Sequence, residues 1–211
     1  MSHLLTDIVI SSTRVLVWTG ISFILGVLLG FLGYAAPGLN RSLLPIVNFF
    51  RHISPFCWLP MIILVAGIGE WPVGIVLLFS MLFNAIIIST GIFQGMQRDI
   101  LDTAALDGAS RRMILRYIQL PLALPELVNL YRVLWSVAWT AIIAAEMLGV
   151  QSGLGYRLLD FRYLLQYKEM LQYIAVIGGI GIAADYLLLH IQKRLSEYLY
   201  RSREVSTQRV R

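Results

Sequence analysis

The sequence predicts an all-α, polytopic bundle of transmembrane helices with about five spans. Of its 211 residues, 58% are hydrophobic and 14% are charged, whereas a soluble domain carries about a quarter charged residues. Three stretches contain no Asp, Glu, Lys or Arg: residues 15–40, 52–69 and 71–97. Because a spanning helix needs ~20 mostly apolar residues, the solvent around much of this chain is predicted to be lipid.

Five spans in a single membrane domain are expected. Two weaker apolar stretches follow the first three and are interrupted by Arg132 and Asp185. The predicted spans are residues 15–36, 45–65, 72–95, 126–147 and 170–192. They belong to one transmembrane domain, residues 1–195, which a basic tail, residues 196–211, follows.

Glycine and proline residues within the first two spans predict how those helices pack and bend. Gly26 and Gly30 lie four residues apart in the first, a spacing that either lets helices approach closely in lipid or is merely tolerated there. Pro55 and Pro60 interrupt the second, and proline removes a backbone donor and kinks a helix. At membrane depth such a kink requires protein or a water-filled path to satisfy the freed carbonyls. The second span is therefore predicted to be kinked and pore-lining.

A polar, charged segment, residues 98–125, separates the third and fourth spans. Ala104 and Ala105 favour helix, whereas Gly108 breaks the pattern or permits the close approach of another backbone. Pro121 then introduces the next span. The segment is predicted to form a helix–bend–helix at one membrane face, where it either binds a soluble partner or rests on the membrane as an amphipathic helix.

The distribution of positive residues predicts the orientation. With the N-terminus outside, the loop near Arg41, the 98–125 segment and the C-terminal tail lie inside and hold eleven Lys or Arg, against four in the outer loops. Positive residues favour the cytoplasmic side, so the C-terminus is expected to be cytoplasmic. Their clustering at the ends of apolar runs indicates membrane orientation, and no nucleic-acid partner is expected.

The spacing within the polar segment resembles the coupling loop of ABC-importer permeases. That motif reads Glu-Ala-Ala, three residues, Gly, nine residues, Ile-x-Leu-Pro. Here Gly108 is followed by nine residues, then Ile118, Leu120 and Pro121. The Glu position holds Asp102, which keeps the charge but shortens its reach. The matching residues, expected to couple to an ATPase, are Asp102, Thr103, Ala104, Gly108, Ala109, Arg111, Ile118, Leu120 and Pro121.

Further motifs in the same order extend the resemblance over roughly residues 10–195. The segments 55–70, 138–139, 145–149 and 152–156 are similar to permeases of the nitrate, sulfonate, taurine and bicarbonate importers. The resemblance implies a type I ABC importer permease-like fold with cytoplasmic coupling helices. It also implies a bacterial inner-membrane location and a small anion as substrate.

The partners implied by the resemblance are two ABC ATPase subunits, a second permease copy in a homodimer, an extracytoplasmic solute-binding protein and the bilayer. This chain has no Gly-x-x-x-x-Gly-Lys-Ser/Thr loop, so ATP and Mg²⁺ would be bound by the partner ATPase and the chain itself is not an enzyme. No catalytic residues, no cofactor and no metal are expected in it. Two alternatives stay open: a permease for another small solute, such as a vitamin precursor or amino acid, and a non-transporting membrane scaffold.

Candidates for the pore or gate come from polar, aromatic and proline residues within the spans. They are Pro55, Trp58, Pro60, Arg132, Trp139 and Glu146. Arg51 and Arg132 either help an anion along the pore or snorkel to the interface. Glu146 is either part of an outer gate or a solvated helix-end carboxylate, and Asp185 either pairs with a neighbouring helix or lies near the inner water boundary.

Overall fold

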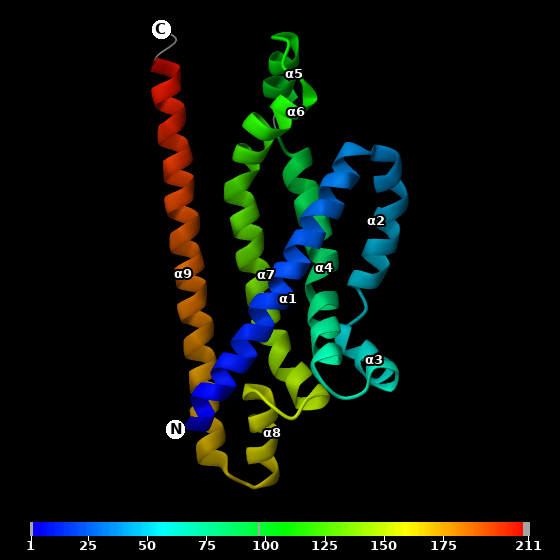
Figure 1. Cartoon of the computed structure of the whole chain (residues 1–211), viewed down its shortest axis with the longest axis vertical. Helices are drawn as coiled ribbons and strands as arrows, with labels where there is room; N and C mark the ends of the chain where they lie inside the picture. The colour runs from blue at the N-terminus through cyan, green and yellow to red at the C-terminus, as the bar shows by residue number, and fades with distance from the viewer. Residues whose placement is uncertain (1, 97, 209–211) are drawn as a thin grey trace.

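The computed structural model describes residues 2–96 and 98–208, and every regular element in these ranges is helical (Figure 1). The elements are α1 (Ser2–Ala35), α2 (Pro37–Arg51), the 3₁₀ turn Pro55–Trp58, α3 (Leu59–Ala66), α4 (Glu70–Gln94), α5 (Arg98–Leu106), α6 (Arg111–Ile114), the π-turn Leu115–Gln119, α7 (Leu120–Gly149), α8 (Leu154–Tyr163) and α9 (Tyr167–Gln208).

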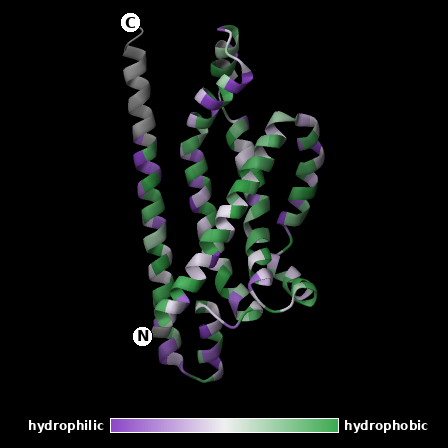
Figure 2. Cartoon of the chain, viewed as in Figure 1, coloured by the Kyte–Doolittle hydropathy of each residue, from purple (hydrophilic) through white to green (hydrophobic). Residues whose placement is uncertain are grey.

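Four helical stretches are long and apolar enough to cross a membrane: Leu4–Ala35, Glu70–Gln94, Arg111–Gly149 and Tyr167–Leu195. A fifth span is formed if the bent pair Pro37–Arg51 and Pro55–Ala66 is taken as one broken crossing. The predicted all-α bundle of about five spans is therefore confirmed. Figure 2 shows hydrophilic residues at the α5–α6 end and around α8, with mostly hydrophobic helices between these ends.

Helix α4 lies at the centre of the bundle and packs against α1, α2, α3 and α7. Its closest neighbour is α1, which crosses it through Gly26 and Gly30. A Cβ atom built on Gly26 would lie 2.3 Å from the Cβ of Ala85, and one built on Gly30 would lie 1.9 Å from the Oγ of Ser89. The hydroxyl of Ser89 donates to the Gly26 carbonyl at 2.9 Å. The glycine pair is thus required for close helix packing.

Two span boundaries differ from the sequence-based prediction. The first helix begins at Ser2 rather than near residue 15. Its early polar residues Asp7, Ser11 and Arg14 are buried against other helices, so they do not face lipid. The second span, expected at 45–65, begins at Pro37 and is broken after Arg51 with a bend of 82°, which is sharper than a proline kink within one helix.

The C-terminal boundary also differs. Helix α9 continues without a break through Gln208, so the predicted division between a domain ending at 195 and a tail beginning at 196 does not coincide with a helix end. Residues 209–211 of that tail lie outside the described residues.

Candidate functional site

The first part of the coupling segment, residues 98–117 with α5 and α6, projects as a tip beyond the ends of α1 and α4 (Figure 1). Helix α5 ends at Leu106, and the chain turns back at Gly108, which has φ +85°. The amide of Ala109 donates to the Ala104 carbonyl at 3.0 Å and closes this turn. A left-handed residue at such a position favours glycine. The predicted helix–bend–helix is therefore present, with Gly108 as the bend.

The tip presents a surface of mixed apolar and charged residues. Leu106 is 87% exposed, and Asp102, Thr103 and Arg111 are also exposed. Ala104 and Ala109 are half-buried behind them. Leu106 is unlike the exposed leucines of the spans, because it ends α5, and Figure 2 shows hydrophilic residues at the α5–α6 end. An exposed leucine framed by charged residues and small alanines suits a protein partner.

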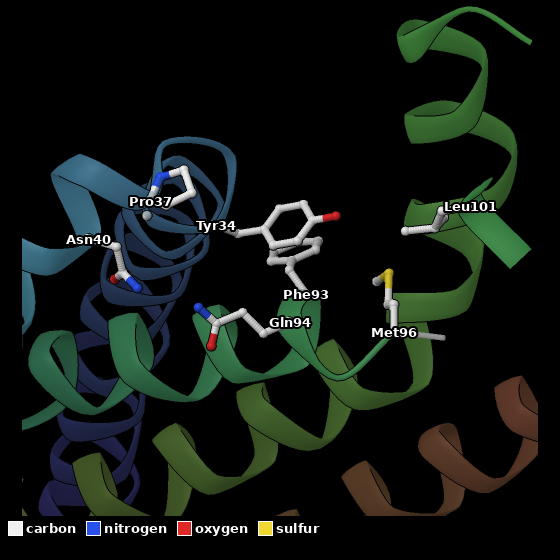
Figure 3. A pocket seen from close by; sticks show the side chains of 8 residues that line it. Tyr34, Pro37, Asn40, Phe93, Gln94, Met96 and Leu101 are labelled. Carbon is white, nitrogen blue, oxygen red and sulfur yellow. The ribbon is translucent and has the colours of Figure 1, made fainter. Parts of the chain in front are cut away.

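Two clefts separate this tip from the bundle. One, of about 700 Å³, lies between Phe31 and Tyr34 of α1 and the tip residues Asp102 and Arg111. The other, of about 340 Å³, is lined by Tyr34, Pro37, Asn40, Phe93, Gln94, Met96 and Leu101 (Figure 3). In Figure 3 the rings of Tyr34 and Phe93 lie together, with centroids 5.9 Å apart. This ring pair joins α1 to α4, and neither α5 nor α6 packs extensively against these helices.

The later residues of the coupling motif lie behind the tip. Ile118 is within the π-turn Leu115–Gln119, and Leu120 and Pro121 begin α7. The amide of Leu120 donates to the Leu115 carbonyl, the i→i−5 pattern of a π-turn. Pro121 has no amide hydrogen and cannot donate a helical backbone hydrogen bond. The π-turn therefore shifts the backbone hydrogen bonds from i→i−4 to i→i−5 just before this missing donor. These residues join the tip to α7, which runs on to Gly149.

At the opposite end, α7 carries Glu146 into a set of polar side chains that we call the Arg14 cluster. Its members are Ser11, Arg14, Glu70, Glu146 and Ser152. Glu146 is fully buried and accepts hydrogen bonds from Ser11 Oγ at 2.8 Å and 2.9 Å, Arg14 Nη1 at 2.8 Å and the Gly155 amide at 2.9 Å. It is therefore not a solvated helix-end carboxylate.

Arg14 connects four segments of the bundle. Its guanidinium donates to Glu146 of α7, to Glu70 at the start of α4, and to the carbonyl and hydroxyl oxygens of Ser152. Its own side chain is 6% exposed, whereas that of Glu70 is 66% exposed. The arginine thus ties α1 to the α7–α8 connection through a buried pair and to α4 through a solvated one.

A second polar set lies one turn earlier on α1. Asp7 accepts hydrogen bonds from Arg157 Nε at 3.2 Å and from the Tyr173 hydroxyl at 3.0 Å. These partners belong to α8 and α9. Asp7, Ser11 and Arg14 recur at one helical face, and together they hold the start of α1 against α4, α7, α8 and α9.

The predicted pore residues fall into separate groups. Pro55 and Trp58 lie in the 3₁₀ turn and Pro60 in the first turn of α3. The Trp58 ring contacts the Phe79 ring of α4, with centroids 6.5 Å apart. Glu146 belongs to the Arg14 cluster on another side of α4, so the structure does not bring these candidates into one site.

Trp139 and Arg132 both contact α9. Trp139 is buried and donates from its indole nitrogen to the Ile177 carbonyl at 3.1 Å. Arg132 forms a bidentate pair with Asp185, with Nε–Oδ1 at 2.6 Å and Nη2–Oδ2 at 2.8 Å. Of the two readings of Asp185, pairing with a neighbouring helix is confirmed. The charge of Arg132 is already matched by a carboxylate.

Sequence reasoning missed Asp7, Arg14, Glu70 and Arg157 as a connected set. Arg14 and Glu146 are 132 positions apart, and Arg157 and Asp7 are 150 apart. The available signal was the spacing of Asp7, Ser11 and Arg14 on one face of a helix that continues into an apolar span.

Comparisons with known proteins agree with this architecture. Residues 21–197 match the family described as binding-protein-dependent transport system inner membrane component. A probable ABC transporter permease of Brucella abortus (strain 2308) is 30% identical over 95% of this chain and 80% of its own length. The taurine transport system permease protein TauC of Escherichia coli is 29% identical over 89% of this chain and 68% of its own length.

The bicarbonate transport system permease protein CmpB of Synechococcus elongatus is 31% identical over 87% of this chain and 66% of its own length. Among solved structures, a chain from the inward-facing MetNI methionine ABC transporter superposes with a TM-score of 0.80 over 92% of this chain and 97% of that chain. Its 19% sequence identity supports the fold alone. This chain belongs to the inner membrane components of binding-protein-dependent transport systems, the multi-pass, non-catalytic permease subunits of ABC importers.

Proposed function

We propose that two copies of this chain form the path of an importer for small anions, such as a sulfonate, nitrate, taurine or bicarbonate. Two separate ATPase subunits, binding ATP and Mg²⁺, would drive it, and an extracytoplasmic binding protein would deliver the solute. The observation that carries the proposal is the coupling segment. Its exposed tip is held to the bundle by few contacts, yet α6 continues through the π-turn into α7.

The continuous helix supplies a mechanical link. At ~1.5 Å per residue, the 39 residues of Arg111–Gly149 span roughly 58 Å. A displacement of the tip by closing ATPases would move α7 as a rigid element and would act on Glu146 near its other end. Switching between inward-open and outward-open states would then be a rigid-body transition of packed helices. The ion pairs and hydrogen bonds of the Arg14 cluster would resist that motion while they are formed and allow it when they break.

The orientation follows from the positive residues. The α5–α6 tip carries Arg111, Arg112 and Arg116, and positive residues favour the cytoplasm. With the tip inside, the start of α1 and α8 lie outside, at the face where a solute-binding protein would dock. The C-terminal end of α9 lies on the tip side of the molecule (Figure 1) and would also be cytoplasmic.

The substrate class rests on the relatives. The taurine and bicarbonate permeases are 29% and 31% identical to this chain, and their solutes share an oxygen-rich anionic group. Because the two sequence identities are nearly equal, they favour small anions as the substrate class but do not favour taurine over bicarbonate.

Uptake into liposomes tests the proposal. The permease would be reconstituted with its ATPase and binding protein, and ATP-dependent uptake of radiolabelled taurine, nitrate, bicarbonate and methionine would be compared. We expect uptake of one of the three anionic solutes and none of methionine. Uptake of methionine alone would refute a small anion as the substrate and support an amino acid instead. Absence of ATP-dependent uptake of any solute would support a non-transporting scaffold.

A matched pair of variants tests the coupling segment in the same assay. Asp102→Lys is expected to abolish ATP-driven uptake, whereas Arg194→Gln, which alters an exposed arginine of α9, is expected to leave uptake unchanged. Full uptake by Asp102→Lys would contradict the assignment of the tip as the ATPase contact.

A further inference from the structure

The break between α2 and α3 lies at half the depth of the bundle. The ring of Phe50 stacks on that of Phe83, with centroids 5.5 Å apart and an interplanar angle of 12°. Phe83 lies near the middle of α4, which runs from Glu70 to Gln94. At ~1.5 Å per residue, it is roughly 20 Å from one helix end and 17 Å from the other. Arg51, the next residue after Phe50, is therefore far from both interfaces.

The surface of α2 differs from the surfaces expected to face lipid. Between Leu16 and Leu32, the exposed residues of α1 are all leucine, isoleucine or valine. Helix α2 exposes the apolar residues Leu39, Ile46 and Phe49. Unlike α1, it also exposes polar residues: Arg41, Ser42, Asn48 and Arg51, followed by His52. A charged side chain at the centre of a bilayer is strongly unfavourable and normally faces water or a partner. The exposed polar face of α2 therefore does not fit a lipid environment.

The backbone at the break supports the same conclusion. Helix α2 ends at Arg51, and a 3₁₀ turn begins at Pro55. His52 and Ser54 in the interruption are exposed, so protein does not cover it. Non-helical backbone at membrane depth is tolerated only where it is buried in protein or lines a water-filled cavity. Since the first condition is not met within this chain, the break fits the second.

Arg51 also differs from Arg14 and Arg132, which lie in other spans. Arg14 is paired with Glu146 and Glu70, and Arg132 is paired with Asp185. Within residues 2–96 and 98–208, no carboxylate forms an ion pair with Arg51 or His52. The fold thus neutralises two arginines internally and leaves a third available for a negatively charged ligand.

We propose that the exposed polar face of α2 lines the translocation path and that Arg51 and His52 form its mid-membrane anion-binding site. This inference rests on the proposed function and deepens it. A guanidinium remains charged and presents parallel N–H donors that match two oxygens of one oxyanion. The site would therefore hold a carboxylate, nitrate, bicarbonate or sulfonate group, and His52 would add a donor from the adjacent position.

Cys57 provides a direct probe of this environment. It is the only cysteine in the sequence, and it is exposed. It precedes Trp58, whose ring centroid is 6.1 Å from that of Phe50. The complete complex in liposomes would be treated with two methanethiosulfonates of similar size, one ending in a sulfonate and one in a trimethylammonium group. The reaction rate of Cys57 with each would be measured by mass spectrometry.

If the face is an anion path, Cys57 reacts with both reagents and faster with the sulfonate. For unit charges ~8 Å apart, effective dielectric constants of ~20 to ~80 give a rate change of roughly 2- to 30-fold. Because the two rates change in opposite directions, Arg51→Gln should lower the ratio of the sulfonate rate to the ammonium rate by the square of this factor, at least roughly fivefold. Arg51→Lys should keep the ratio, because it retains the charge, and Arg194→Gln should leave it unchanged.

Two labelling results would overturn the inference. If Cys57 reacts with neither reagent in the assembled complex but reacts after denaturation, the face is covered by lipid or by the second copy. If it reacts equally with both, and Arg51→Gln leaves the ratio unchanged, the site does not select anions. Neither result depends on knowing the transported solute.

Transport by the same variants separates this inference from the proposed function. In a wild-type complex that imports an anion, Arg51→Gln should lower uptake at subsaturating solute at least tenfold, while ATPase assembly persists. Normal anion uptake by Arg51→Gln would refute the site and leave the importer assignment intact. If the wild-type complex imports no anion, the proposed function fails, and the labelling ratio still decides whether the α2 face attracts anions.

Discussion

Glu146→Ala removes the acceptor at the centre of the Arg14 cluster and is the most informative change to the fold. The carboxylate of Glu146 is fully buried and accepts from Ser11, Arg14 and the amide of Gly155. Alanine would leave a buried guanidinium without its buried counter-charge. It would also leave the Gly155 amide without an acceptor.

The expected loss of stability follows from this burial. Removing one partner of a buried ion pair costs about 3–5 kcal/mol, because the other charge is left uncompensated. For chains of about this size, 1 kcal/mol shifts Tm by ~2–4 °C. Glu146→Ala should therefore lower Tm by roughly 6–20 °C.

Glu70→Ala is the matched control, since Glu70 pairs with the same guanidinium. Its side chain is 66% exposed, and an exposed ion pair contributes about 1 kcal/mol or less. The expected fall in Tm is at most roughly 4 °C. Both variants would be purified in detergent and heated, and the monodisperse fraction would be followed by size-exclusion chromatography. If Glu146→Ala lowers Tm no more than Glu70→Ala, burial does not determine how much each ion pair of this cluster contributes to stability.

Three further predictions concern other parts of the bundle. Gly108→Val should uncouple ATP hydrolysis from uptake in liposomes while leaving membrane insertion intact, because a φ of +85° is strained for a β-branched residue. Arg132→Asp should reduce the yield of folded protein, and adding Asp185→Arg should restore most of it, since the pair is bidentate across α7 and α9. Gly30→Leu should prevent folding, because a built Cβ lies 1.9 Å from a side-chain oxygen of α4. Gly20→Leu, with nothing within 4 Å of a built Cβ, should fold normally, and fluorescence-detected size exclusion distinguishes the two.

The sequence predicted those features whose physical cause is local. Apolar runs predicted the spans because lipid requires them whatever the neighbouring helices are. The turn at Gly108 was predictable because a helix end and a glycine within a few residues define it. The Arg14 cluster was not predictable in this way, because its members come from α1, α4, α7 and the α7–α8 connection.

The depth of Arg51 shows how an incorrect helix start changes a functional reading. With the second span placed at 45–65, Arg51 lies within two turns of the inner interface and can snorkel. The structure starts α2 at Pro37, which places Arg51 roughly 21 Å from the start of the helix at ~1.5 Å per residue, against roughly 9 Å from a start at residue 45. Sequence hydropathy cannot detect the true start of α2, because the polar residues on one of its faces lower the hydropathy of its first half. The span then appears shorter than it is.

Arg14, Arg51 and Arg132 divide between stabilising the fold and serving transport according to their partners. Arg14 and Arg132 each meet a carboxylate from another helix, so their charges join elements of the bundle. Arg51 meets none among residues 2–96 and 98–208, although it lies at a depth where an unmatched charge is least tolerated. A fold that compensates two such charges has the means to compensate a third. Its exposure therefore indicates that the missing negative charge comes from outside this chain, which for a permease subunit is most simply the solute.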